Sequence, residues 1–217
     1  MEYLLIFSLG ASIASFLGVV IERFPQQSIV TPASHCDRCR HKLAWYDLIP
    51  IFSQLLSGFR CRYCQIKIPP WYALFEAIIG CLALLTYLNY LDFWLAYCLV
   101  FSLTLTIYDL KTRSFPLIIW LAFSLPILFY FGFNSRAVTL LSLALLAEFK
   151  DIKIGSGDLF YLASLSLTLG LTDLLWTIQI GSLTALFVAL YQLKKGPQSP
   201  IPFVPFLLIG YMCVSFL

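Results

Sequence analysis

The distribution of apolar residues along the chain is the feature that most constrains its fold. Six predominantly apolar runs are about long enough to cross a bilayer, at 3–21, 71–91, 93–108, 117–133, 173–193 and 201–217. Two shorter runs, 137–148 and 159–171, fall below the ~20 residues of a full crossing, and we expect them to form tilted or partly buried helices. Because 60% of the residues are hydrophobic and only 12% are charged, a soluble domain is excluded. The sequence therefore predicts an all-α polytopic membrane protein with about eight transmembrane helices.

The basic residues indicate how these helices are oriented. Thirteen of the fourteen Lys and Arg residues fall on one side of the predicted spans, and only Arg136 falls on the other. The thirteen are Arg23, Arg38, Arg40, Lys42, Arg60, Arg62, Lys67, Lys111, Arg113, Lys150, Lys153, Lys194 and Lys195. Since basic loops stay in the cytoplasm, we expect a multi-pass membrane protein with both termini outside the cytoplasm.

The first cytoplasmic loop, at 24–70, is the one long hydrophilic stretch, and it carries four cysteines. Cys36 and Cys39 form one Cys-x-x-Cys pair, and Cys61 and Cys64 form a second after 21 intervening residues. Two such pairs can present four thiolates tetrahedrally to zinc, although this separation is one residue beyond the usual zinc-ribbon range. Disulfides are the alternative, but a cytosolic loop is kept reduced. We therefore expect a small zinc-ribbon-like loop domain whose zinc is structural, because four cysteines leave no coordination position open.

Among the acidic residues at the ends of apolar runs, two are the strongest candidates for a functional pair. Asp158 follows the polar, glycine-bearing segment Lys153–Gly157, and Asp109 lies at the charged end of the run at 93–108. An acid at a membrane boundary is costly and is a functional-site candidate, whereas the alternative is that Asp158 only caps the following helix. The inferred topology places both acids at the cytoplasmic edge of the membrane. We predict that Asp109 and Asp158 form a working pair.

The chemistry of such a pair follows from its charge. Two carboxyl groups that are held close together cannot both ionise, so one keeps its proton. The ionised group can activate water while the protonated group polarises a carbonyl, which is the chemistry of aspartyl peptide hydrolysis. Gly155 and Gly157 would form an active-site loop, allowing close backbone approach to a bound strand or unusual dihedral angles.

Taken in order along nearly the whole chain, these motifs resemble the type IV prepilin peptidase family, a branch of the Gly-x-Gly-Asp membrane aspartyl proteases. The resemblance begins with the segment Ser15–Pro25 and continues through the paired cysteines, Asp47–Pro50, Gly58–Cys64 and Tyr72 with Glu76. Asp109 followed by basic residues and a proline, and then Gly155–Asp158, complete it. One departure is visible, because the family often has lysine where this chain has Phe160.

The resemblance implies an endopeptidase that removes the basic leader of type IV prepilins or pseudopilins at the cytoplasmic face, cutting after glycine. Asp109 and Asp158 match the family's catalytic aspartates. The resemblance also implies N-methylation of the new N-terminus with S-adenosylmethionine. The expected organisation is a first transmembrane helix at 1–23, a four-cysteine zinc-binding loop domain at 24–70 and a membrane-embedded aspartyl peptidase core at 71–217. The expected partners are prepilins or pseudopilins and the lipid bilayer, with no nucleic acid.

Two other functions remain compatible with the residues. One is a non-catalytic membrane assembly factor, in which the zinc loop docks a partner and the acids only cap helices. The other is a general intramembrane Gly-x-Gly-Asp protease, for which a cytosolic zinc loop would be unexpected. Activity that survives loss of either aspartate would favour the assembly factor.

Overall fold

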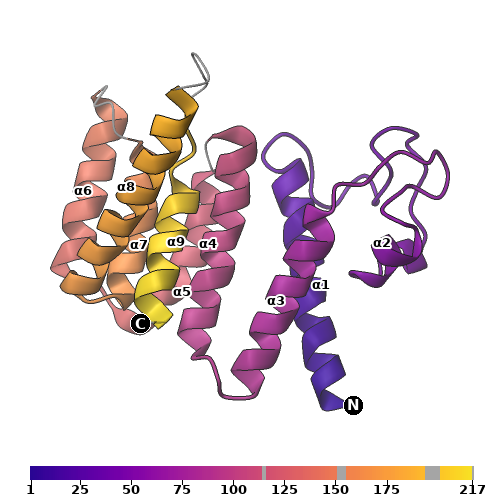
Figure 1. Ribbon diagram of the computed structural model, residues 1–217, viewed down its shortest axis with the longest axis horizontal. Coiled ribbons are helices and arrows are strands. Elements are labelled where there is room, and N and C mark those ends of the chain that lie inside the picture. The colour runs from indigo at the N-terminus through magenta and orange to yellow at the C-terminus, as the bar shows by residue number, and fades with distance from the viewer. Residues whose placement is uncertain (114–115, 151–154, 194–200, 217) are drawn as a thin grey trace. The chain divides into compact units, whose positions relative to one another are not determined.

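The computed structural model describes residues 1–113, 116–150, 155–193 and 201–216, and its regular structure within these ranges is helical (Figure 1). The predicted all-α class is confirmed. Eight helices correspond to the eight apolar runs, and they are α1 (Glu2–Arg23), α3 (Trp71–Tyr87), α4 (Phe93–Thr112), α5 (Leu117–Phe131), α6 (Ser135–Phe149), α7 (Ser156–Thr168), α8 (Leu171–Leu193) and α9 (Val204–Phe216). The loop at 24–70 holds the 3₁₀ helix η1 (Trp45–Leu48) and the short helix α2 (Phe52–Leu56). Lys153, Lys194 and Lys195, which were used to predict the topology, lie outside the described residues.

The helix lengths correct one detail of the prediction. Within the described ranges, α1, α4 and α8 are long and apolar enough to cross a membrane, whereas α3, α5 and α9 are apolar but shorter than their predicted runs. The helix α3 ends at Tyr87 because Asn89 takes a positive φ of 59°. The helix α5 ends at Phe131 because Gly132 takes a φ of 71°, a conformation that favours glycine. Hydropathy continues through both turns, so the apolar runs overestimate the lengths of α3 and α5.

The chain separates into two compact units, Met1–Ala96 and Tyr97–Leu217. In the first unit, α1 and α3 pack side by side through small residues (Figure 1). A methyl group added at Gly10 would lie 2.7 Å from Ala83 Cβ, and one added at Gly80 would lie 2.8 Å from the Phe7 ring. Such close approach of small residues is how helices associate where lipid offers no hydrophobic driving force.

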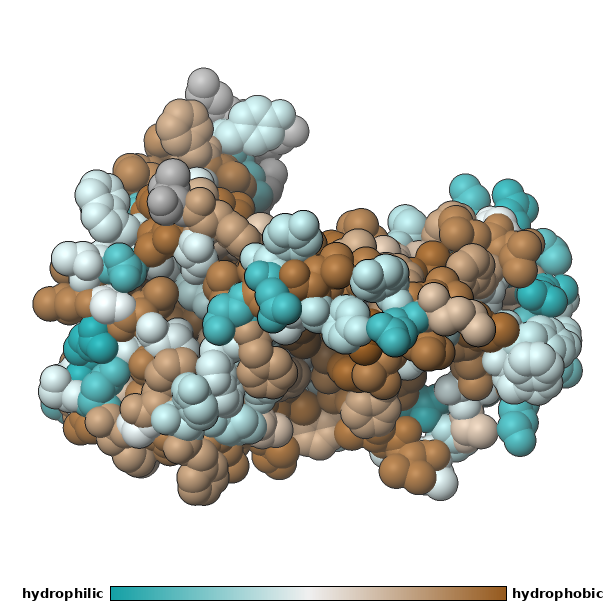
Figure 2. Space-filling view, turned by 90° about the horizontal axis from the view of Figure 1, so that it is seen from below, coloured by the Kyte–Doolittle hydropathy of each residue, from teal (hydrophilic) through white to brown (hydrophobic). Residues whose placement is uncertain are grey.

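In the second unit, α7 packs against α5 and α6, and α8 packs against α9. The contact between α8 and α9 is again close, because a methyl group at Gly210 would collide with the backbone carbonyl of Thr177. Large apolar side chains remain on the outside, including Phe129 at 86% exposure and Phe187 at 80%. Apolar residues also cover much of the face seen in Figure 2. This surface belongs in a bilayer, since a soluble protein rarely exposes such extensive apolar area.

Candidate functional site

Asp109 lies in the last turns of α4 and is largely buried, with 8% of its surface exposed. Its Oδ2 accepts a hydrogen bond of 3.0 Å from the backbone N–H of Val204, the first residue of α9. The first N–H groups of a helix have no partner within it, so a carboxylate at that position satisfies one of them. The contact fixes the Asp109 carboxyl group against the start of α9.

Asp158 lies in the first turn of α7, where Gly155 occupies the N-cap position. Asp158 is therefore not the cap residue that the alternative interpretation would require. A methyl group at position 155 would lie only 2.8 Å from Asp158 Oδ2. Gly155 has an ordinary φ of −61°, so its backbone does not demand glycine, but a larger side chain here would displace the Asp158 carboxyl group.

The structure brings Asp109 and Asp158 together at one cavity of about 690 Å³ in the second unit. Gly155 and Gly157 line the same cavity, although Gly157 lies in the first turn of α7 and not in a loop as predicted. The full lining is Asp109, Arg113, Leu117, Glu148, Gly155, Ser156, Gly157, Asp158, Phe160, Ile201, Pro202, Phe203 and Val204. A cavity of this size, which combines three acids and an arginine with apolar side chains, has the character of a substrate site.

Buried polar contacts hold α7 in place behind the cavity. Tyr161, which is fully buried, donates from Oη to Ser102 Oγ on α4 over 2.8 Å. Trp120 on α5 donates from Nε1 to the backbone oxygen of Phe160 over 2.9 Å and to Ser164 Oγ over 2.8 Å. These contacts set the rotation of α7 and therefore the direction in which Asp158 points. Sequence analysis missed them, because no local pattern shows which helices a buried tyrosine or tryptophan will join.

Phe160, where the family often has lysine, is an apolar wall of the cavity. Its ring packs against Trp120 with the ring centroids 4.9 Å apart, and only 7% of its surface is exposed. This position therefore adds no charge to the cavity, and its aromatic ring packs between α5 and α7 instead.

The four cysteines of the loop form a second candidate site, in the first unit. Their sulfur atoms all lie within 4.8 Å of one another. The two Cys-x-x-Cys pairs have equivalent backbones. The N–H of Arg40 donates to Cys36 O and the N–H of Gln65 donates to Cys61 O, and Arg40 and Gln65 both have a φ of 58°. Each pair is thus a tight knuckle that turns both of its sulfurs to the same side.

The sulfur positions suit a metal ion. Tetrahedral bonds of ~2.3 Å to zinc separate the sulfurs by about 3.8 Å, and Cys36 Sγ lies 3.7 Å from Cys64 Sγ. All four cysteines are free thiols. The cluster can therefore hold a metal ion, as the sequence predicted.

The thiols of the cluster differ in acidity. Burial acts to raise the pKa of Cys36, but hydrogen bonds from the backbone N–H groups of Cys39 and Arg38 and from neighbouring thiols outweigh it and bring the pKa to about 7. For Cys64, the backbone N–H of Ile66 acts to lower the pKa, but burial and the neighbouring thiols raise it to about 11. Without metal, some of the four thiols are protonated. A metal ion must displace these protons before all four sulfurs can bind it.

One contact anchors the loop to α3, and a second joins two parts of the loop. Glu76, in α3, is buried with 5% exposure, and its Oε2 accepts a hydrogen bond of 2.7 Å from the backbone N–H of Ile51. Arg62 forms an ion pair of 3.0 Å with Asp47, close to the second knuckle. Asp47 therefore connects η1 to the second knuckle of the cysteine cluster.

Comparisons with known proteins agree on one family. A sequence model of the Bacterial Peptidase A24 N-terminal domain matches residues 8–90. The prepilin leader peptidase/N-methyltransferase of Pectobacterium carotovorum is 30% identical over 93% of this chain and 88% of that protein. The protein of the same name from Bacillus subtilis is 28% identical over 95% of this chain and 90% of its own length. The one from Myxococcus xanthus is 50% identical over 36% of this chain and 23% of its own length. No solved structure matches the chain.

Proposed function

The chain belongs to the prepilin leader peptidase/N-methyltransferase family, and we propose that it is a membrane aspartyl endopeptidase with Asp109 and Asp158 as its catalytic residues. Its substrates are type IV prepilins or pseudopilins, from which it removes the basic leader by cutting after glycine. The observation that supports this proposal most directly is that both aspartates line one cavity, although 49 positions separate them in the sequence.

The two carboxyl groups act as a pair that shares one proton. The ionised carboxyl removes a proton from a water molecule as that water attacks the carbonyl carbon of the scissile bond. The protonated carboxyl donates a hydrogen bond to the carbonyl oxygen, and the leaving amine then takes a proton from the pair. The hydrogen bond from Val204 holds Asp109 in a fixed orientation throughout.

Cleavage takes place at the cytoplasmic face of the membrane. Asp109 lies near the end of α4 and Asp158 near the start of α7, so both face the same side if successive helices cross in alternating directions. The loops on that side carry thirteen of the fourteen basic residues. The basic leader of a substrate would stay at the same headgroup level, with its scissile bond near the cavity. The division into a first helix at 1–23, a loop domain at 24–70 and a peptidase core at 71–217 belongs to this proposal.

The cysteine cluster binds one structural zinc ion through Cys36, Cys39, Cys61 and Cys64. Four thiolates complete a tetrahedral site, so the ion stabilises the loop without offering a position for water. A loop of this size buries little apolar surface, and metal binding would supply free energy that the loop needs to fold.

The second activity in the relatives' names is N-methylation. We extend it to this chain, with S-adenosylmethionine as the methyl donor. The new N-terminal amine of the cleaved substrate would then receive one methyl group.

One experiment separates these activities from the alternatives. The protein is co-expressed with candidate prepilins, and leader loss and N-terminal mass are read from the same purified substrate by mass spectrometry. We expect a shortened substrate that carries one additional methyl group. If the substrate is fully cleaved but its new N-terminus is unmodified, only the peptidase activity is supported. Intact substrate would favour the assembly factor. Cleavage within transmembrane segments of unrelated proteins would favour the general intramembrane protease.

A further inference from the structure

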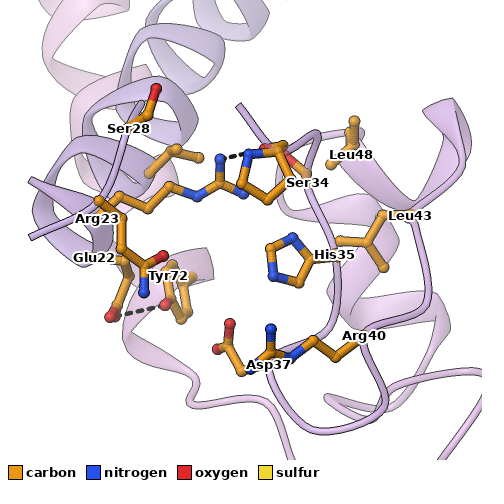
Figure 3. A pocket seen from close by; sticks show the side chains of 13 residues that line it. Glu22, Arg23, Ser28, Ser34, His35, Asp37, Arg40, Leu43, Leu48 and Tyr72 are labelled. Carbon is orange, nitrogen blue, oxygen red and sulfur yellow. Dashed lines mark hydrogen bonds between the residues drawn. The ribbon is translucent and has the colours of Figure 1, made fainter. Parts of the chain in front are cut away.

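Two buried side-chain polar atoms of the described residues have no hydrogen-bond partner within the protein, Gln54 Oε1 and Thr106 Oγ1. Gln54 lies in the loop at 24–70, whereas Thr106 lies in α4, where only 8% of its surface is exposed. A polar contact between two other helices shows the usual arrangement, in which the Tyr72 hydroxyl of α3 donates to Glu22 of α1 over 2.6 Å (Figure 3). An unpaired hydroxyl inside a membrane-spanning helix is costly, so we expect a polar partner for Thr106.

Other hydroxyl groups of α4 are satisfied within the helix. Ser102, Thr104 and Thr112 each donate to the backbone oxygen four residues earlier, over 2.6, 2.7 and 2.9 Å respectively. Serine and threonine in membrane helices commonly form this bond. Thr106 has the same option at the backbone oxygen of Ser102, but it does not make that bond. Its hydroxyl group therefore remains open to another partner.

Thr106 lies on the face of α4 that meets α7. Ser102, Thr106 and Asp109 are spaced i, i+4 and i+7, so they lie within an arc of about 60° on one side of the helix. Ser102 accepts a hydrogen bond from Tyr161 of α7. Asp109 lines the same cavity as Asp158, which also belongs to α7. Along this face, Thr106 lies between the contact at Ser102 and the carboxyl group of Asp109.

A single water molecule can bridge Thr106 and Asp109. Side chains three positions apart on a helix have Cβ atoms about 5–6 Å apart, and two hydrogen bonds of about 2.8 Å through one water oxygen span that distance. Thr106 does not line the cavity, so a water molecule held by it would lie behind the carboxyl group and out of the path of the substrate. Water can reach this position from the cavity of about 690 Å³.

We propose that Thr106 Oγ1 holds a buried water molecule that donates a hydrogen bond to the Asp109 carboxyl group. Thr106 is thus a positioning residue, which acts on the scissile bond only through Asp109. The N–H of Val204 holds the same carboxyl group from α9, so the water molecule and this N–H fix it from two helices. This role rests on the proposed peptidase function, because the group that Thr106 orients is one of the two catalytic carboxyl groups.

The test compares Thr106→Val with Thr106→Ser in the full-length, zinc-loaded protein. Valine has nearly the shape of threonine but no hydroxyl, whereas serine keeps the hydroxyl and loses the methyl group. Thr106→Ala, which differs from Thr106→Ser by one oxygen atom, repeats the comparison with a smaller side chain. Thr104→Val is the matched control, because Thr104 is fully buried in the same helix and its hydroxyl donates within α4. Cleavage of a purified prepilin gives kcat and KM, and thermal unfolding gives Tm.

We expect Thr106→Val and Thr106→Ala to lower kcat by about tenfold or more with little change in KM, because a hydrogen bond that orients a charged group is lost. Thr106→Ser and Thr104→Val should keep kcat within about twofold of the parent, since both retain the hydroxyl at position 106. The Tm of Thr106→Val should not exceed that of the parent. A hydroxyl without any partner would instead make valine the more stable residue at this position.

The role of Thr106 is overturned if Thr106→Val keeps the parental kcat or raises Tm. It is also overturned if Thr106→Ser or Thr104→Val loses as much kcat as Thr106→Val. Asp109→Asn and Asp158→Asn, measured in parallel, separate this result from the proposed function. If both are inactive while Thr106→Val cleaves at the parental kcat, only the role of Thr106 fails, whereas cleavage by either aspartate variant overturns the proposed function as well.

Discussion

The backbone N–H of Val204 donates to Asp109 Oδ2 across 3.0 Å and joins residues that are 95 positions apart. Because Val204 begins α9, this contact connects the start of the last helix to a proposed catalytic carboxyl group. Proline is tolerated at the first position of a helix, so Val204→Pro can delete the donor while allowing α9 to form. Val204→Ala is the matched control, since it removes most of the side chain but keeps the N–H.

We expect Val204→Pro to lower kcat by about tenfold or more with little change in KM, because it removes a hydrogen bond to a charged group that orients the reaction rather than binding the leader. Val204→Ala should retain most of kcat. Cleavage kinetics on a purified prepilin measure both constants. Equal losses in the two variants would mean that packing of the buried valine, rather than its N–H, is what matters.

Gly155 provides a second test of the site. In Gly155→Ala the new methyl group would lie 2.8 Å from Asp158 Oδ2, so the carboxyl group must move. A displacement of ~1 Å can cost a factor of ~100 in rate, and we expect a loss of that order without loss of folding. Gly170→Ala is a closely matched control, because its methyl group would lie 3.1 Å from Asp173 Oδ2 in the same i, i+3 arrangement outside the cavity. Comparable loss in both variants would point to a general effect on helix starts.

The acidity of the thiols predicts how zinc binding depends on pH. At pH 8, Cys36, with a pKa of about 7, is mostly a thiolate before metal arrives, whereas Cys64, with a pKa of about 11, must still lose its proton. Below about pH 7, Cys36 is protonated too, so binding releases one more proton and affinity falls more steeply as the pH decreases. Competition with a zinc chelator between pH 6 and 8.5 measures this slope. A slope that stays constant through pH 7 would contradict the predicted order of deprotonation.

The orientation of the helices is open to a direct test. Thirteen of fourteen basic residues on one side predict both termini outside the cytoplasm. A reporter fused after Gly132, which follows α5, should therefore report an extracytoplasmic position, and one fused after Lys195 should report the cytoplasm. The reverse pattern would refute the orientation and, with it, a cytoplasmic active site.

Hydropathy was sufficient to predict the helices but not their ends. Each of the eight apolar runs contains a helix, because a bilayer requires the backbone polar groups to be satisfied within each segment. The predicted ends of α3 and α5 were too long, because the turns at Asn89 and Gly132 depend on backbone conformation within sequences that stay apolar. A hydropathy profile therefore does not show where these two helices end.

The candidate site was predictable in part. Asp109 and Asp158 could be selected from the sequence because acids at membrane boundaries are rare and costly. The four cysteines could be selected because their spacing matches metal sites. The backbone donor at Val204 could not be selected, because every residue except proline has a backbone N–H. The acceptor of this hydrogen bond lies on a helix that is distant in the sequence. The hydrogen bond between Tyr161 and Ser102 could not be predicted either, because it depends on how α4 and α7 pack.

The most direct test of the account replaces each aspartate with asparagine in the full-length, zinc-loaded protein and follows leader removal from a purified prepilin. Asp109→Asn and Asp158→Asn should each abolish cleavage, and the double variant should be no worse than either one, because the two carboxyl groups act as a unit. Asp173→Asn, in the first turn of α8, is the control and should cleave at the parental rate. Thermal unfolding and zinc content show that all four proteins are folded. Cleavage at a comparable rate by either single aspartate variant would contradict the aspartyl mechanism.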